Sequence, residues 1–269
     1  MFECYNLSLG DDYKRQLDPY SILSKSSLHV EKQRAREKLR EFYIDGFDKI
    51  DAKSLKNMWF PSYEIPSHVF ISHSHKDIEK AETFAAWLKS EFNIDSFIDS
   101  NIWGFAEELM MEINEAHSKI SNNLYSLEKA NYTSSHVHMM LSSALTEVID
   151  SCECLFFLNT NNSLTSDETT CSPWIMHELL VSKVINRVQK VERVSLGLNH
   201  LIESVAKAES NYPKFHHHAH TDHLTEMGIS KLMSWKSKKA SNKGPYGQLT
   251  ELYNLFRASD SQLYYSGTR

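Results

Sequence analysis

Three hydrogen-bonding side chains, Ser72, His73 and Ser74, follow a short apolar run in the segment His68–Asp77, HVFISHSHKD. The β-branched and aromatic residues before them predict a strand, so these side chains should lie where that strand ends. Hydroxyl and imidazole groups in such a position are suited to hold a phosphate or a ribose. The spacing Ser74-x-x-Asp77 is also typical of a helix start, which gives Ser74 a capping role as an alternative.

A carboxylate and an aromatic ring lie close together in a second segment, Phe97–Gly104, FIDSNIWG. Its first residues predict another strand, and Asn101–Gly104 is expected to be a loop because asparagine and glycine favour turns. Asp99 can accept a hydrogen bond from a ligand hydroxyl, and Trp103 can stack on an aromatic base.

A third segment, Ser172–Leu180, SPWIMHELL, has the sequence of a helix start. Serine is a favoured N-cap, and Pro173 stands at the first helical position, where its missing N–H is not needed. Trp174 and Glu178 are then one turn apart on the same face. We expect the Glu178 carboxylate at the upper edge of the core, only partly in water. Core packing for Trp174 and a solvated or paired charge for Glu178 are the alternatives.

The elements that must position these segments alternate between strand and helix. Strand-like runs occur near residues 68–72, 96–99, 154–158 and 193–198, and helical patterns near 78–92, 106–116, 137–148 and 173–188. Cys154–Leu158 is apolar on both faces, as a central parallel strand requires. The alternation predicts an α/β fold, a flavodoxin-like doubly wound parallel sheet, with ligands at the carboxyl ends of its strands. The loops after Ser72, Asp99 and Leu158 should therefore face one crevice.

The chain is expected to have three regions. Residues 1–64 are charged and predicted helical, with one amphipathic helix over Glu31–Lys49. Residues 65–200 form the α/β domain, apart from an irregular excursion at 118–135 that is rich in serine and asparagine. Residues 201–269 are a predicted helical extension packed on that domain.

The composition argues against several classes of protein. The chain has 8 glycines and 6 prolines among 269 residues, with no G-x-G-x-x-G spacing and no P-loop, which disfavours Rossmann dehydrogenases and P-loop NTPases. A net charge of -6 argues against a nucleic-acid partner. Its 4 cysteines form no disulfide framework in so long a chain, and no apolar run approaches a membrane span. With no signal-peptide pattern, the sequence favours a cytoplasmic protein without a membrane partner.

A histidine-rich tract, His216–His223, HHHAHTDH, resembles a metal-binding segment. It lacks the fixed ligand spacing of a structural zinc site, so we expect a polar surface loop and no metal centre. Cys152 and Cys154 alternate across a strand start, which directs their thiols to opposite faces and argues against a shared metal.

In this order and spacing, the three segments resemble the Toll/interleukin-1 receptor (TIR) domain, particularly its bacterial branch. V-F-I-S-H-S…D resembles the first strand and loop of the family, and S-P-W-x-x-x-E-L resembles its fourth-helix motif. The segment after Asp99 occupies the place of the mobile BB loop. The resemblance covers roughly residues 66–200, about half of the chain.

The resemblance implies that NAD+ is the substrate and that no cofactor is needed. Many bacterial TIR proteins, including defence proteins of the Thoeris type, cleave the bond between nicotinamide and ribose. The glutamate four residues after the tryptophan is essential for this, and here it is Glu178. A fixed carboxylate can stabilise the positive charge that develops on the ribose. The expected substrate-binding residues are Ser72, His73, Ser74, Asp99, Trp103 and Trp174.

The family further implies an NAD+ nucleosidase or ADP-ribose cyclase in bacterial anti-phage defence. Its implied partners are further copies of the chain, through TIR–TIR contacts, and a separate effector protein that senses the product. The loop after Asp99 lacks the R-D-x-x-P-G sequence of animal TIR adaptors and has Ser100–Glu107, SNIWGFAE, instead. Two rival functions stay open: a non-catalytic interaction module that signals by self-association, and a hydrolase of free nucleosides.

Overall fold

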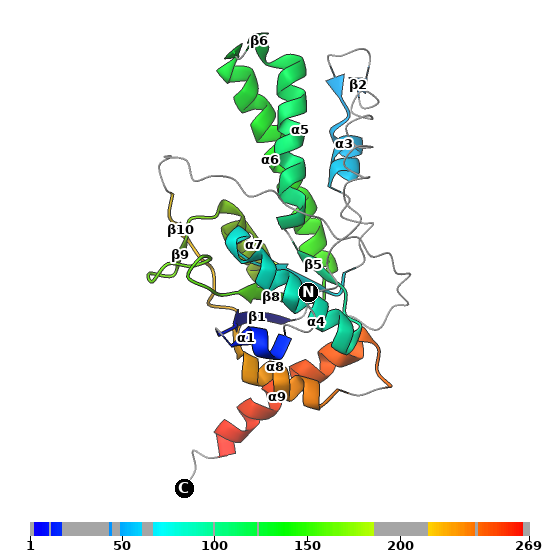
Figure 1. Cartoon of the computed structure of the whole chain (residues 1–269), viewed down its shortest axis with the longest axis vertical. Coiled ribbons are helices and arrows are strands. Elements are labelled where there is room, and N and C mark those ends of the chain that lie inside the picture. The colour runs from blue at the N-terminus through cyan, green and yellow to red at the C-terminus, as the bar shows by residue number, and fades with distance from the viewer. Residues whose placement is uncertain are drawn as a thin grey trace.

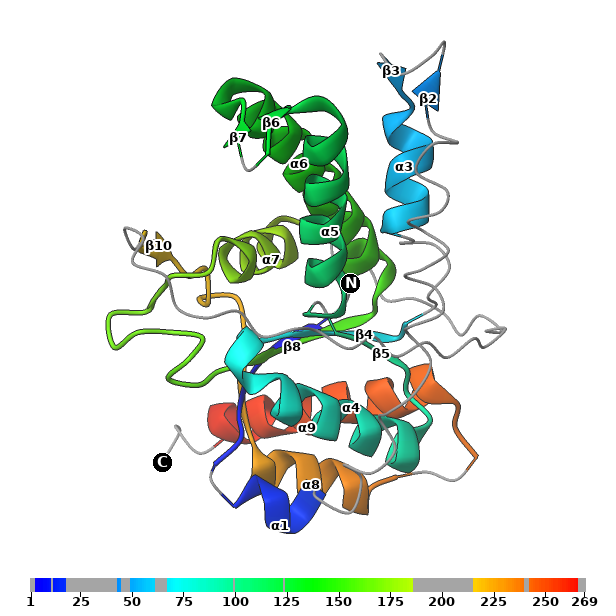
Figure 2. The ribbon, with the colours of Figure 1, turned by 45° about the horizontal axis from the view of Figure 1, so that its top comes forward.

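The structure is a computed structural model that describes residues 3–10, 12–17, 43–44, 49–60, 67–98, 100–122, 124–185, 215–239 and 242–265. For residues 43, 44, 49, 100–105 and 258–265 it describes the backbone alone. Within these residues, a five-stranded sheet is covered by helices on both faces (Figures 1 and 2).

All strands of this sheet run parallel, in the order β11-β1-β8-β4-β5. Their bounds are β1 (Glu3–Ser8), β4 (Val69–Ser72), β5 (Ser96–Ile98), β8 (Cys154–Leu158) and β11 (Thr225–Gly228). Every residue of β4 and β8 is buried, as an apolar sequence on both faces predicts for central strands. The prediction of an α/β fold with a parallel sheet is confirmed.

The strand order departs from the flavodoxin-like order at β1. Along the chain from residue 65, β4 is the first strand of this sheet, β5 the second and β8 the third. Their order in the sheet, β5-β4-β8, is the order of the second, first and third strands of flavodoxin-like sheets. The next position is taken by β1, which pairs with β8 on one side and with β11 on the other. Cys4, Tyr5 and Leu7 are buried there, and this burial holds the segment in the sheet. The prediction of helix at the start of the chain is therefore wrong for Glu3–Ser8.

Two groups of helices cover the two faces of the sheet, and Figure 2 shows them on opposite sides. Phe70 and Phe157 point into the core of one face, and Ile71 and Phe156 into the core of the other. The first face carries α3 (Ala52–Trp59), α5 (Ser100–His117), α6 (Leu127–Ser151) and α7 (Pro173–Val184). The second face carries α1 (Tyr13–Leu17), α4 (Ile78–Phe92), α8 (Ile229–Ser237) and α9 (Pro245–Tyr265).

The C-terminal helices form part of the core of the second face. Trp235 of α8 stacks on Phe92 of α4, with ring centroids 3.9 Å apart, and meets Trp87 edge-on at 6.1 Å. Its indole N–H donates a hydrogen bond to the carbonyl of Gln248 in α9 over 2.9 Å. The sheet and its core thus draw on residues from all of the regions expected along the chain.

The helices α5 and α6 form a long hairpin that projects away from the sheet (Figures 1 and 2). Its turn contains the short antiparallel strands β6 (Lys119–Ser121) and β7 (Leu124–Tyr125). The prediction of a loop at Asn101–Gly104 is wrong, because α5 begins at Ser100. The irregular excursion predicted at 118–135 is wrong from residue 127 onward, because α6 begins at Leu127. No proline interrupts the chain between residues 66 and 173, and Ser126 caps α6 by accepting from the N–H of Lys129.

Other predictions fall partly or wholly outside the described residues. The strands β2 (Tyr43–Ile44) and β3 (Lys49–Ile50) pair antiparallel, so the helix predicted over Glu31–Lys49 is wrong at that end, and its other residues are not described. The strand predicted near 193–198 also lies outside the described residues, and α7 ends at Val184. Among the described helices, none is long and apolar enough to cross a membrane.

Candidate functional site

Ser72 and Glu178 lie in direct contact although 106 positions separate them in the sequence. Ser72 is the last residue of β4, and its Oγ donates a hydrogen bond to Oε2 of Glu178 over 2.6 Å. Both side chains are fully buried, at 0% exposure. Two of the three candidate segments of the sequence therefore meet at the carboxyl end of β4.

The start of α7 fixes how Glu178 is presented. Ser172 Oγ accepts a hydrogen bond from the N–H of Ile175 over 3.3 Å, and Pro173 opens the first turn, which confirms the predicted helix start. One face of α7, with Ile175, Glu178 and Leu179, is buried. Glu178 is thus deeper in the molecule than the partly hydrated edge position that we expect from its sequence.

The helix α7 also packs on α6. Nε2 of His177 lies 3.3 Å from Thr146 Oγ1 and 3.3 Å from the carbonyl oxygen of Ser142. Burial lowers the pKa of His177 below its usual value, and the contact with that carbonyl opposes this shift. The ring of Trp174 is half-buried against the core and meets His138 edge-on at 5.7 Å. Trp174 therefore packs on the core, the alternative that the sequence leaves open, and its role in substrate binding stays a prediction.

The turn after β4 contains the other predicted donors. His73 is buried, with Nδ1 3.3 Å from the carbonyl oxygen of Ile71. The predicted capping by Ser74 is wrong, because its side chain makes no capping hydrogen bond. A short 3-10 helix, η3 (His75–Asp77), comes first, and its Asp77 N–H donates to the Ser74 carbonyl over 2.7 Å.

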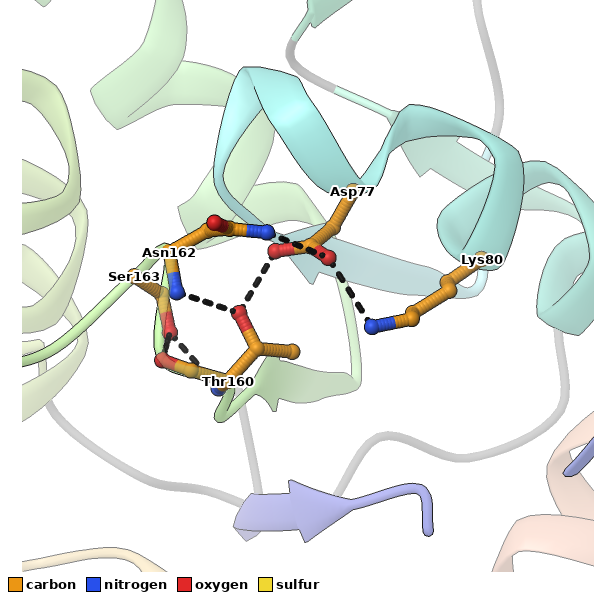
Figure 3. A network of polar contacts seen from close by, with 5 residues as sticks. All are labelled: Asp77, Lys80, Thr160, Asn162 and Ser163. Carbon is orange, nitrogen blue, oxygen red and sulfur yellow. Dashed lines mark hydrogen bonds and ion pairs between the residues drawn. The ribbon is translucent and has the colours of Figure 1, made fainter. Parts of the chain in front are cut away.

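Asp77 joins the turn after β4 to the loop after β8 (Figure 3). Its Oδ2 accepts from Thr160 Oγ1 over 2.5 Å, and its Oδ1 accepts from Asn162 Nδ2 over 3.1 Å. Lys80 Nζ also donates to Oδ1 over 3.1 Å. The N–H of Thr160 donates to Ser163 Oγ over 2.9 Å, which closes the loop on itself. Two of the loops expected to face one crevice are therefore connected.

Sequence reasoning missed Thr160, Asn162 and Ser163 as members of this edge of the sheet. The available signal was the loop composition, since threonine, asparagine and serine side chains often bond to nearby backbone in turns. Asp99 lies outside the described residues, and Trp103 is described only as backbone of α5. Their predicted roles therefore stay predictions.

The histidine-rich tract runs beside α7. His217–His218 is the strand β10, which pairs antiparallel with β9 (Thr169–Thr170) just before the helix. Further along, His223 Nε2 lies 2.8 Å from Ser182 Oγ, and Asp222 pairs with Lys183 over 2.9 Å. Among the residues that the structure describes, no group of histidine, cysteine and acidic side chains is arranged to hold a metal ion.

The arrangement at this edge is a buried carboxylate of α7 that a serine hydroxyl holds at the carboxyl end of β4. Ligands of open parallel sheets bind at the carboxyl ends of the strands, where this pair lies. A carboxylate there can stabilise a developing positive charge or accept hydrogen bonds from ligand hydroxyls. Comparisons with known protein families, with curated proteins and with solved structures give no match to this chain.

Proposed function

We propose that this chain is a TIR-like enzyme that cleaves NAD+ at the bond between nicotinamide and ribose, with Glu178 as the catalytic carboxylate. The observation that supports this most is the 2.6 Å hydrogen bond from Ser72 Oγ to Glu178 Oε2. The TIR-like motifs supply these two residues from separate segments, one at a strand end and one in a helix. Their contact is the pairing that a shared site requires.

Cleavage of this bond requires one carboxylate and little general acid catalysis. The bond between ribose C1′ and nicotinamide N1 breaks, and its electron pair leaves with the nicotinamide, which is already cationic in NAD+. Glu178 stabilises the positive charge that develops on the ribose. A water oxygen then bonds to C1′ and loses a proton, which gives ADP-ribose. In a cyclase, an adenine nitrogen takes the place of that water.

The hydrogen bond from Ser72 fixes the orientation of the Glu178 carboxylate. The donors of Ser72, His73 and Ser74 are the substrate-binding groups of the turn after β4, with Asp99, Trp103 and Trp174 as further candidates. Because Glu178 is fully buried, NAD+ can reach it only if α7 or a neighbouring loop moves. The proposal therefore includes a local opening when the substrate binds.

The setting of this activity is part of the proposal and is supported by the motif resemblance. It is cytoplasmic anti-phage defence, in which copies of the chain associate and a separate effector senses the product. Depletion of NAD+ is the other route by which such an enzyme acts.

A non-catalytic interaction module is the second candidate function. The observation in its favour is the number of large apolar side chains exposed on the α5–α6 hairpin. Leu127 is 76% exposed, Met111 72% and Tyr132 68%. Exposed apolar patches often mark surfaces that bind another protein.

One incubation separates these functions. Purified protein is mixed with NAD+ over a range of protein concentrations, nicotinamide is followed by chromatography and the second product by mass. Nicotinamide with ADP-ribose supports the nucleosidase, and a product lighter by one water supports the cyclase. No nicotinamide at any concentration favours the interaction module. Cleavage of free nucleosides with NAD+ left intact favours the nucleoside hydrolase.

A further inference from the structure

A buried carboxylate near the candidate site has no part in the chemistry above. We propose that Asp77 is a positioning residue, which holds the loop Asn159–Ser163 after β8 in the place where that loop binds the substrate. This inference rests on the proposed function, and it assigns the loop to the binding of NAD+.

The partners of Asp77 indicate what it positions. The residue is only 2% exposed, and a buried carboxylate is unfavourable unless hydrogen bonds compensate it. Two of its donors, Thr160 and Asn162, come from the loop after β8, 83 and 85 positions along the chain. Two of these three hydrogen bonds to Asp77 thus come from a loop that is remote in sequence.

The loop is ordered around Thr160. The Thr160 hydroxyl donates to Asp77 and also accepts from the N–H of Asn162 over 3.1 Å. The loop begins where the N–H of Asn159 donates to the carbonyl of Leu7 in β1, over 2.9 Å. One anchor is therefore the neighbouring strand, and the other is the Asp77 carboxylate.

This loop lies where an open α/β sheet takes its ligands. The strands β4 and β8 are neighbours, with Ser72 opposite Phe157 in register. The chain leaves β4 toward α4 on one face of the sheet, and it leaves β8 toward α7 on the other face. Neighbouring parallel strands whose connections diverge in this way open a crevice at their carboxyl ends. Asp77 joins the two loops that follow β4 and β8, and Ser72, which contacts Glu178, is the last residue of β4.

The three donors of Asp77 allow a matched set of variants. Thr160→Val keeps the side-chain shape and removes a donor that comes from the loop. Lys80→Met removes a donor to the same carboxylate, but from α4 rather than from the loop. Asp77→Asn replaces one acceptor oxygen with an NH2 group, which then faces another donor.

The experiment measures KM and kcat for nicotinamide release, together with hydrogen exchange of the amides at 160–163. We expect Thr160→Val and Asp77→Asn to raise KM by about tenfold or more, with kcat within about threefold of wild type, because the loop binds but does not react. Lys80→Met should leave KM within about twofold of wild type. An equal rise of KM in Lys80→Met and Thr160→Val would overturn the proposal, as would a fall of kcat with KM unchanged.

Hydrogen exchange is measured without NAD+, so it separates this inference from the proposed function. The amides of Thr160 and Ser163 decide the outcome, because Thr160→Val also removes the acceptor of the Asn162 N–H. Exchange at these two amides that is faster in Thr160→Val than in Lys80→Met supports the tether, the hydrogen bonds from the loop to Asp77, whether or not the wild type releases nicotinamide. Equal exchange in the two variants overturns it. If the tether holds but the wild type leaves NAD+ intact, the assignment of the loop to NAD+ fails together with the proposed function.

Discussion

One hydrogen bond, from Ser72 Oγ to Glu178 Oε2 over 2.6 Å, joins the end of β4 to the middle of α7. Both side chains are fully buried, so water does not compete for this bond. Hydrogen bonds to charged groups contribute more to stability than those between neutral groups. The pair is therefore both the candidate reaction centre and a structural connection between the sheet and the helix.

Removal of the hydroxyl in Ser72→Ala should lower the free energy of unfolding by about 1.5–3 kcal/mol, because the buried carboxylate loses a donor. Urea denaturation measures this loss. Ser143→Ala is the matched control, since that hydroxyl is exposed and donates to the carbonyl of Met139 within its own helix, α6. A loss in Ser72→Ala no larger than that in Ser143→Ala would contradict the structural role.

The stacking of Trp235 on Phe92 predicts that the C-terminal helices are needed for the stability of the whole domain. Trp235→Ala should cost about 3–5 kcal/mol, because it opens a cavity between α4 and α8. Met139→Ala, at a side chain that is 66% exposed, should change stability by less than about 0.5 kcal/mol. Equal unfolding midpoints for the two variants would show that α8 lies outside the cooperative core.

Stability should fall in mild acid because of His68. Burial lowers the pKa of His68 below its usual 6.5, and the nearby Asp95 carboxylate, itself paired with Lys89, opposes this shift. Between the lowered pKa and 6.5 the unfolded chain binds more protons than the folded chain, so stability decreases as pH falls through that window. His177, with a pKa lowered by burial, contributes in the same direction.

The variant His68→Asn tests this pH dependence. The asparagine oxygen can accept the Asp95 N–H in place of Nδ1, which now accepts it over 3.0 Å. Urea midpoints measured from about pH 7 to about pH 5 should fall less in the variant than in wild type. Parallel pH profiles would show that His68 does not titrate differently on folding.

The two contacts between the histidine-rich tract and the end of α7 should differ in strength. Ser182 is fully buried where it meets His223, whereas the side chains of Lys183 and Asp222 are 38% and 65% exposed. His223→Ala should therefore destabilise the protein by about 1 kcal/mol, and Lys183→Ala by less than about 0.5 kcal/mol. Hydrogen exchange along α7 and urea denaturation check this order. The reverse order would mean that the exposed ion pair is the main attachment.

Local patterns were sufficient to predict the centre of this fold. The uniformly apolar run Cys154–Leu158 indicates a strand buried on both faces, and Ser172 with Pro173 indicates the start of α7. The rule that loops at the carboxyl ends of parallel strands converge predicts that the segments of Ser72 and Glu178 come together, but not that the two side chains are in contact and fully buried.

Features set by distant contacts could not be predicted in the same way. The segment Glu3–Ser8 is a strand because β8 and β11 lie on its two sides, and no short-range pattern contains that information. Asp77 has the spacing of a helix cap, but the Thr160 hydroxyl competes for its carboxylate. Asn101–Gly104 is helical although its residues favour turns. It belongs to α5, and the buried side chains of Leu109 and Ile113 stabilise that helix further along the chain.

The most direct test of the account is the rate of nicotinamide release from NAD+ by Glu178→Gln, measured beside Glu153→Gln and wild type. Glu153 is a matched control, since it is also buried, at 2% exposure, but directly precedes β8, at the amino ends of the strands. We expect a loss of about a hundredfold or more in Glu178→Gln, with Glu153→Gln within about threefold of wild type. Wild-type release by the Glu178→Gln protein would contradict it.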